Sequence, residues 1–207
     1  MANKYLWLLD NGHGGVIDGL YQTPGKRSPL WSDGSILYEG EFNRAIINRL
    51  VEMLTIDHIN YVNITPEYED ISLNERVRRA NTYYQQSDEQ LNCVFLSVHS
   101  NAGGGKGYEI YTSKGETLSD KAATIFFDKF KGEFPEANMR VDTLDNDPDK
   151  EADFYVLKNT KMPAVLTENF FMDNEHECKT YLMTHEGRDR IAKAHYNAIK
   201  AIEEFGL

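Results

Sequence analysis

The chain has 207 residues, of which 41% are hydrophobic and 12% aromatic, so it can bury the core of one domain spanning residues 1–207. Its formal net charge of −11 and pI near 5.0 disfavour nucleic acid and anionic membranes as partners, because both select for clustered Lys and Arg. The two cysteines, Cys93 and Cys178, form no CxxC motif and no disulfide framework, which favours reduced thiols in a reducing cytoplasm.

The first half of the chain alternates between strand and helix patterns. The opening apolar run, YLWLLD, is too short to span a membrane and lacks the basic start of an export signal, so we predict an interior strand. Ser72 stands three residues before Glu75, the spacing of a capping box that opens a helix. The successive patterns predict strand, loop, helix, strand and helix over residues 5–10, 12–34, 39–54, 59–65 and 72–86.

The second half continues this alternation. The run CVFLSVH is continuously apolar, as is typical of a strand buried on both faces. The patterns predict strands over residues 93–99, 107–113, 154–158 and 163–171, and helices over residues 118–134 and 185–205. We therefore expect an α/β fold, a single domain with a mostly parallel twisted sheet flanked by helices.

Ionisable residues stand where several predicted strands end. His13 follows the first strand, His99 ends FLSVH, Glu168 ends PAVLTE, and Glu39 begins the first helix. Ligands in open α/β sheets bind outside the carboxyl ends of the strands, so these side chains are candidates for one site. Two histidines and two glutamates suit a catalytic zinc site, with three of them on the metal and one carboxylate left to move protons.

Each of these residues also has a purely structural explanation. A histidine beside glycines is usually a turn residue, and a glutamate in the first turn of a helix is favoured by the helix dipole. Glu168 and His99 are harder to explain in this way, because an ionisable group that ends an apolar strand is costly to desolvate without a partner or metal. Their joint placement favours a functional site.

Five ordered motifs resemble those of the zinc-dependent N-acetylmuramoyl-L-alanine amidases of the Amidase_3 family. They are DNGHGG at 10–15, EGEFN at 39–43, LNERVRRAN at 73–81, FLSVHSNA at 95–102 and MPAVLTENFFMDN at 162–174. The resemblance extends over nearly the whole chain. The chain looks like the catalytic domain of a phage or prophage endolysin, or of an autolysin. It implies that His13, Glu39 and His99 hold zinc and that Glu168 is the catalytic carboxylate.

The assignment of the metal-binding glutamate has one competitor. Glu39 stands four residues before Asn43, as the metal-binding glutamate of the family does, whereas Glu41 would point to another side of the helix. The chain departs from the family at Asn11, where proline is common. The long loop over residues 16–38 also leaves the contacts with substrate open.

Several neighbouring residues have expected supporting roles. Asp10 and Asn101 flank the ligand histidines and are candidates to orient them, with loop-fixing hydrogen bonds as an equal alternative. The glycines that follow His13 and His99 are expected to leave room for a polymeric substrate. Arg76 is expected to form a structural ion pair. Packed or solvated roles are expected for His58, His176, His185 and His195.

The resemblance implies hydrolysis of the amide between N-acetylmuramic acid and L-alanine in peptidoglycan or a muropeptide. Zinc would activate a water and polarise the carbonyl, and Glu168 would carry the water's proton to the leaving amine. A zinc peptidase that cuts within the stem peptide and an inactive cell-wall binding module are the alternatives. We expect a monomer without membrane insertion, made in the cytoplasm without a signal peptide, which reaches the wall after lysis, holin-type release or other export.

Overall fold

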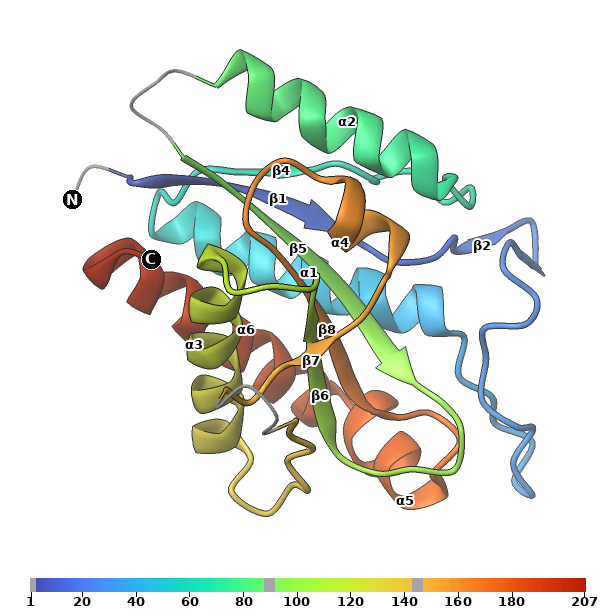
Figure 1. Cartoon of the computed structure of the whole chain (residues 1–207). Helices are drawn as coiled ribbons and strands as arrows, with labels where there is room; N and C mark the ends of the chain where they lie inside the picture. Colours follow the sequence, from blue (N-terminus) through green and yellow to red (C-terminus); the bar gives the residue numbers. More distant parts are fainter. Residues whose placement is uncertain (1–2, 88–91, 143–146) are drawn as a thin grey trace.

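A six-stranded sheet forms the centre of the computed structural model, which describes residues 3–87, 92–142 and 147–207 (Figure 1). The strand order is β4-β1-β5-β8-β6-β7. Strands β4, β1, β5 and β8 run parallel to one another, whereas β6 runs antiparallel to β8 and parallel to β7. The bounds are β1 Tyr5–Asp10, β4 Tyr61–Asn63, β5 Asn92–Asn101, β6 Tyr108–Thr112, β7 Lys150–Glu151 and β8 Ala164–Phe171. The mostly parallel α/β sheet is therefore confirmed.

Helices cover both faces of this sheet. The larger core includes Trp7 and Leu9 of β1 and packs against α1 (Glu39–Ile56), α3 (Leu118–Glu133) and α6 (His185–Phe205). The smaller core includes Leu8 and lies under α2 (Leu73–Gln86) and α4 (Tyr155–Asn159). Because successive strand residues point to opposite faces, the apolar run of β1 contributes to both cores.

Shorter elements complete the described part of the chain. The long loop after β1 contains a two-stranded hairpin of β2 (Val16–Ile17) and β3 (Leu20–Tyr21), and a short turn of α5 (Glu175–Glu177) leads into the π-helix η1 (Cys178–Leu182). Within the described ranges, no helix is both long enough and apolar enough to cross a membrane.

The capping box predicted at Ser72 and Glu75 forms only in part. Ser72 accepts a hydrogen bond from the backbone of Glu75, as predicted, but the Glu75 carboxylate binds Arg78 and Arg79 instead of returning to the cap. The reciprocal capping box forms at α3, between Thr117 and Asp120. The negatively charged Glu75 side chain forms ion pairs instead of a cap, because the guanidinium groups of Arg78 and Arg79 lie within about one helical turn of it.

The prediction of a strand over residues 154–158 is wrong, because this segment forms helix α4. Val156 and Leu157 are buried in the smaller core, while Phe154 and Tyr155 are 38% and 41% exposed. A run of five residues is too short to distinguish the helical period from the strand period. Here one turn of helix buries the two consecutive residues Val156 and Leu157.

Candidate active site

His13, Glu39 and His99 meet at the carboxyl edge of the parallel sheet. His13 follows β1, His99 lies in β5, and Glu39 is the first residue of α1. The turn into His13 passes through Gly12, which has φ of 74°. A Cβ at Gly12 would lie 2.4 Å from Asn43 Nδ2 and 2.8 Å from His99 Cε1, so glycine is required for the turn to pack against α1 and β5.

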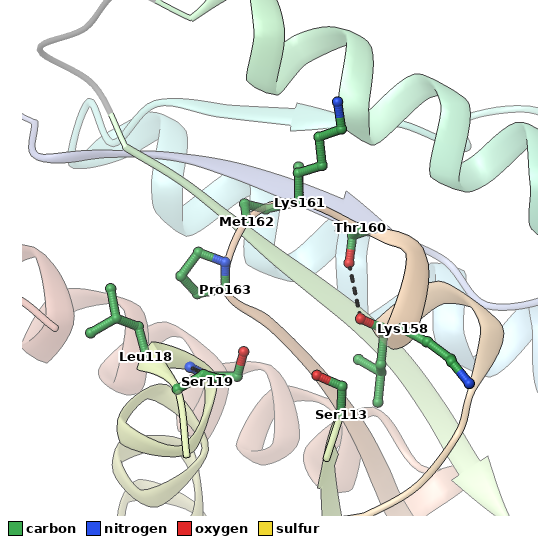
Figure 2. A pocket seen from close by; sticks show the side chains of 10 residues that line it. Ser113, Leu118, Ser119, Lys158, Thr160, Lys161, Met162 and Pro163 are labelled. Carbon is green, nitrogen blue, oxygen red and sulfur yellow. Dashed lines mark hydrogen bonds between the residues drawn. The ribbon is translucent and has the colours of Figure 1, made fainter. Parts of the chain in front are cut away.

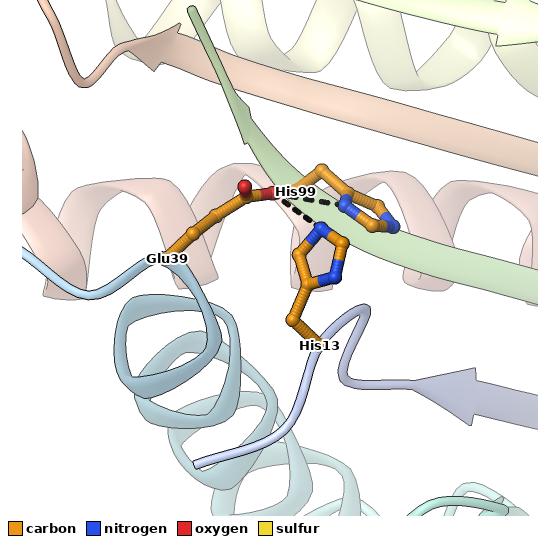
Figure 3. Close-up of side chains that lie close together, drawn as sticks. All are labelled: His13, Glu39 and His99. Atoms are coloured by element: carbon orange, nitrogen blue, oxygen red, sulfur yellow. Dashed lines mark hydrogen bonds and ion pairs between the residues drawn. The ribbon is translucent and has the colours of Figure 1, made fainter. Parts of the chain in front are cut away.

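The three side chains converge on one point. Oε1 of Glu39 lies 3.0 Å from Nδ1 of His99 and 3.3 Å from Nε2 of His13. The two imidazole rings meet edge to face with centroids 5.0 Å apart, and one ligand atom from each residue lies within 4.8 Å of the others. Figure 3 shows the carboxylate directed at nitrogen atoms of both rings.

Buried atoms without partners indicate that this cluster suits a cation. Among the described residues, Nε2 of His13 and Oε2 of Glu39 are buried and have no hydrogen-bond partner. Leaving such atoms unpaired is costly, and a metal ion would satisfy both. Two imidazole nitrogens and a carboxylate oxygen also form a ligand set that zinc accepts. The arrangement therefore fits a metal ion.

The protonation states fit the same conclusion. Burial raises the pKa of the Glu39 carboxyl, but its close polar contacts with His13 and His99 and the charges of these residues outweigh burial and hold this pKa well below its usual range. Burial lowers the pKa of the His99 imidazole, and Glu39 offsets only part of that effect. A carboxylate and a neutral imidazole are the forms that bind metal ions.

Glu168 lies beside this cluster on the neighbouring strand. It is half-buried in β8, and its Cα pairs with that of His99 in β5. Both residues line a cavity of about 300 Å³ together with His13. Within the described chain, Oε2 of Glu168 has no hydrogen-bond partner. A free carboxylate oxygen that shares a cavity with His13 and His99 is placed to exchange a proton with a group bound there.

The surroundings of Glu168 raise its pKa. Burial raises the pKa of Glu168 well above its ordinary value, the charges of Glu39 and Glu109 raise it further, and Lys26 opposes them. A carboxyl group with a raised pKa is a better base than an exposed one.

Asp10 reaches His99 through an intermediate serine. Ser97 Oγ donates to Asp10 Oδ2 at 2.6 Å and lies 3.1 Å from Nε2 of His99. Asp10 is buried and also forms an ion pair with Arg76, which confirms the structural ion pair predicted for that arginine. Burial raises the pKa of Asp10, but Arg76 and Ser97 outweigh it, so the pKa lies below its ordinary value.

The structure places Asn101 in a different network. Its amide donates to Oε2 of Glu109 at 2.5 Å, and its Oδ1 accepts from the backbone of Ala102. Glu109 also binds Tyr111, Arg140 and Lys150. The loop-fixing alternative therefore describes Asn101 better than a role in orienting a histidine.

The glycines after the two histidines differ in their surroundings. A Cβ at Gly14 would lie 2.8 Å from the backbone nitrogen of Asp70, and one at Gly15 would lie 2.5 Å from Tyr68. The expectation that these two leave room for a polymer is wrong, because they pack against the protein itself. Gly103 and Gly104 have no atom within 4 Å of an added Cβ and do border open space.

The alternative residues lie outside the cluster. Oε1 of Glu41 accepts a hydrogen bond from the backbone of Val16 and so fixes the loop. His195 is buried between Thr167 and the carbonyl of Ile191. The other histidines are distributed over the surface elements, namely His58 after α1, His176 in α5 and His185 at the start of α6.

Sequence reasoning missed Ser97 and the walls of the cavity. Ser97 precedes His99 by two residues on one strand and thus faces the same side, a signal that the period of a strand supplies. The walls include Lys26, Phe154 and Tyr155. These residues come from a loop and from the segment taken for a strand, so the sequence pattern could not bring them together.

A second hollow lies apart from the candidate active site. It lies between the start of α3 and the segment that joins α4 to β8, and Figure 2 shows Lys158 and Lys161 at its margin. It shares no lining residue with the cavity beside His13. This hollow therefore adds nothing to the candidate active site.

Comparisons with known proteins identify N-acetylmuramoyl-L-alanine amidases as relatives of this chain. The sequence profile of N-acetylmuramoyl-L-alanine amidases, Amidase_3, matches residues 8–201. The sporulation-specific N-acetylmuramoyl-L-alanine amidase of Bacillus subtilis is 30% identical over 196 residues, which are 93% of this chain and 66% of that protein. The endolysin of Bacillus phage SPP1 is 32% identical over 181 residues, 84% of this chain and 57% of the endolysin. The chain thus spans under two thirds of these relatives.

Solved structures show the same fold. The N-acetylmuramoyl-L-alanine amidase of Clostridium difficile 630 superposes with a TM-score of 0.76 at 23% identity, over 99% of each chain. The amidase Ami1 of Mycobacterium smegmatis gives a TM-score of 0.75 at 19% identity, over 98% of this chain and 99% of Ami1. These similarities extend over the whole described sheet and its helices.

Proposed function

The chain belongs to the Amidase_3 family of N-acetylmuramoyl-L-alanine amidases, and on this premise we propose that it cleaves the amide between N-acetylmuramic acid and L-alanine of the peptidoglycan stem peptide. The observation that carries the proposal is the convergence of His13, Glu39 and His99 beside a cavity that His13, His99 and Glu168 line together. These four residues supply a metal-binding set and a separate proton-transferring carboxylate, which are the two requirements of metal-assisted amide hydrolysis.

The proposed ligands of a zinc ion are His13, Glu39 and His99. Zinc bound there supplies Lewis acidity for the scissile carbonyl and for the attacking water. Glu168 accepts the proton of that water and transfers it to the nitrogen of the leaving L-alanine, because an expelled amine must be protonated. Ser97 holds the His99 ring through Nε2 and leaves Nδ1 directed at Glu39.

Two other functions make different predictions. A zinc peptidase that cuts within the stem peptide would use the same four residues, so only its products separate it from an amidase. An inactive cell-wall binding module would be expected to lack a ligand or the catalytic carboxylate. The presence and convergence of all four residues support the enzyme.

The test is an assay on purified peptidoglycan that combines metal analysis with mass spectrometry of the products. We expect one zinc ion per chain and free stem peptides that begin with L-alanine from the native protein. Glu168→Gln should keep its zinc and lose activity by about 100-fold or more, since it removes the proton acceptor but no ligand. Exposed Glu116→Gln is the matched control and should act like the native protein.

The products decide among the three functions. Fragments cut inside the peptide would replace the amidase with the peptidase. Absence of both zinc and products would leave the binding module. Full activity of Glu168→Gln would remove that residue from the reaction.

The proposed place of action is the bacterial cell wall. The similarity to a phage endolysin supports a protein that meets the wall after lysis, holin-type release or other export. The monomeric state stays a prediction, which gel filtration with light scattering measures.

A further inference from the structure

The cavity beside the metal-binding cluster has an apolar part and a single cationic residue. Leu73, Phe154, Tyr155 and Leu166 provide its apolar lining. Lys26 is the only lysine or arginine among the described residues that line this cavity. The cavity thus presents one positive charge to whatever binds beside the metal.

The backbone at Lys26 is fixed to the metal-binding cluster. Its carbonyl oxygen accepts a hydrogen bond of 3.0 Å from the backbone nitrogen of Glu39. The next residue, Arg27, forms an isolated β-bridge with Tyr38, which precedes Glu39. Lys26 therefore extends from a point whose position is set by a proposed metal ligand, and its exposed side chain needs no reordering of the loop to reach the cavity.

Lys26 also has no ion-pair partner within the described parts of the chain. Other lysines are held by carboxylates, for example Lys150 by Glu109 at 2.5 Å and Lys179 by Glu175 at 2.8 Å. Exposed lysines such as Lys121 and Lys161 also have no ion pair within the described parts of the chain, so what distinguishes Lys26 is its position in the lining of this cavity. A free ammonium group beside a reaction site is available to a ligand.

The neighbouring charges make this cation important for an anionic substrate. Glu39 is a carboxylate at the site, and Glu168 shares the cavity with Lys26. A bound zinc ion would offset the charge of Glu39, but the carboxylate of Glu168 would still repel a carboxylate on the bound peptide unless a further cation lay close to it. The ammonium group of Lys26 is the described charge that can offset this repulsion within the cavity.

We propose that Lys26 determines specificity by binding a carboxylate of the stem peptide close to the scissile amide, so that peptides with this group free are preferred over their amidated forms. The inference rests on the proposed amidase function. It names the substrate class of that site as anionic stem peptides. Amidation of the carboxylate removes the charge but keeps nearly the same shape, so it isolates the contact with Lys26.

The test compares two soluble muropeptides that differ only in one carboxylate near the scissile amide, free in one and a primary amide in the other. For the native protein we expect kcat/KM to be about tenfold higher on the free carboxylate, an effect of the size of one charge-assisted hydrogen bond. Lys26→Met should lose this preference through a higher KM on the charged substrate, with kcat changed less than about twofold. Lys26→Arg should keep most of the preference.

Two controls separate this inference from the function on which it rests. Lys161→Met removes an exposed lysine from the other hollow and should leave the preference intact. Calorimetric titration with the two L-alanyl peptide products needs no hydrolysis, and the charged product should bind native protein about tenfold more tightly than Lys26→Met. Cleavage of neither muropeptide would reject the amidase, while the titration would still decide the role of Lys26.

The opposite results would overturn the inference. If Lys26→Met kept the preference for the charged substrate, another group would bind the carboxylate. If it slowed both substrates equally through kcat and shifted the pH profile, Lys26 would act on Glu168 rather than on the substrate. Equal binding of both products to the native protein would show that the cavity does not discriminate charge.

Discussion

Ser97 connects His99 to a buried charge. Its hydroxyl donates to Asp10 Oδ2 and therefore accepts from Nε2 of His99, which places the imidazole proton on Nε2. Nδ1 then carries the lone pair and faces Glu39 at 3.0 Å. One hydroxyl thus selects the tautomer in which the nitrogen nearest to Glu39 is free to bind a metal.

We expect Ser97→Ala to weaken zinc binding by about 10- to 100-fold, because the imidazole loses the acceptor that sets its tautomer and orientation. Competition with a chelator of known affinity measures the change. Ser100→Ala is the control, since this buried hydroxyl lies on the same strand and, among the described residues, donates only to the carbonyl of Phe170 at 3.4 Å. Equal zinc affinity in Ser97→Ala and native protein would contradict the assignment.

Glu39 and Glu41 offer a second comparison at the residue scale. Glu39→Gln removes the negative charge between two histidines, so we expect zinc affinity to fall by about 100-fold or more. Glu41→Gln changes a side chain that holds the backbone of Val16 and should keep zinc. Metal content after dialysis distinguishes them, and zinc retained by Glu39→Gln would transfer the ligand role elsewhere.

Four site residues could be placed from the sequence, while their supports could not. His13 follows β1, His99 and Glu168 lie near the carboxyl ends of β5 and β8, and Glu39 opens a helix, so the topology of a parallel sheet brings them to one edge. Hydrogen bonds such as that between Asn101 and Glu109 depend on side-chain directions across strands. Strand ends in the sequence contain no such information.

At the scale of elements, α1 is held directly against the loop that carries His13. A Cβ at Gly40 would lie only 1.8 Å from the carbonyl oxygen of Gly14. The first turn of α1 and this loop therefore touch through their backbones. Because Glu39 and His13 stand on the two sides of this contact, its spacing sets the distance between these two proposed metal ligands.

We expect Gly40→Ala to lower the free energy of unfolding by about 1 to 3 kcal/mol, because helix and loop must separate to admit the methyl group. It should also weaken zinc binding. Gly132→Ala, in α3, meets no atom within 4 Å and should stabilise the protein by about 0.5 to 1 kcal/mol. Urea unfolding of both metal-free variants measures the difference. An unchanged free energy of unfolding in Gly40→Ala would show that helix and loop can move apart without cost.

The elements themselves were predictable where they were long. Helices α1, α3 and α6 show the helical period over many residues, and β1, β5 and β8 are apolar runs with clear ends. Helix α4 was mistaken for a strand, and the β2–β3 hairpin of the long loop was not expected. Such short elements are decided by tertiary contacts, which a local pattern does not contain.

At the scale of the whole molecule, His195 makes stability depend on pH. Burial lowers the pKa of His195 to about 4, and the carbonyl of Ile191 offsets part of this effect. The unfolded chain binds the proton near pH 6.5, so between these values it holds more protons than the native state. Stability from this group is therefore present above pH 6.5 and is lost as the pH falls toward 4.

Between pH 7 and pH 5 we expect this histidine to cost about 2 kcal/mol of unfolding free energy. Urea unfolding of metal-free native protein and His195→Gln at both pH values measures this difference, since contributions common to both proteins cancel. His176→Gln, a change at an exposed position, should follow the native protein. If the native protein and His195→Gln lost the same free energy of unfolding between pH 7 and pH 5, the buried histidine would be excluded as the cause.

The position of β8 bears on the order in which the chain is made. It is the last strand in the sequence, yet it lies between β5 and β6 in the sheet. During synthesis, β5 and β6 cannot pair with β8 until β8 has left the ribosome, because two segments pair only after both have emerged. The nascent chain holds His13, Glu39 and His99 well before Glu168 arrives, so the proposed hydrolysis can begin only when the sheet is complete.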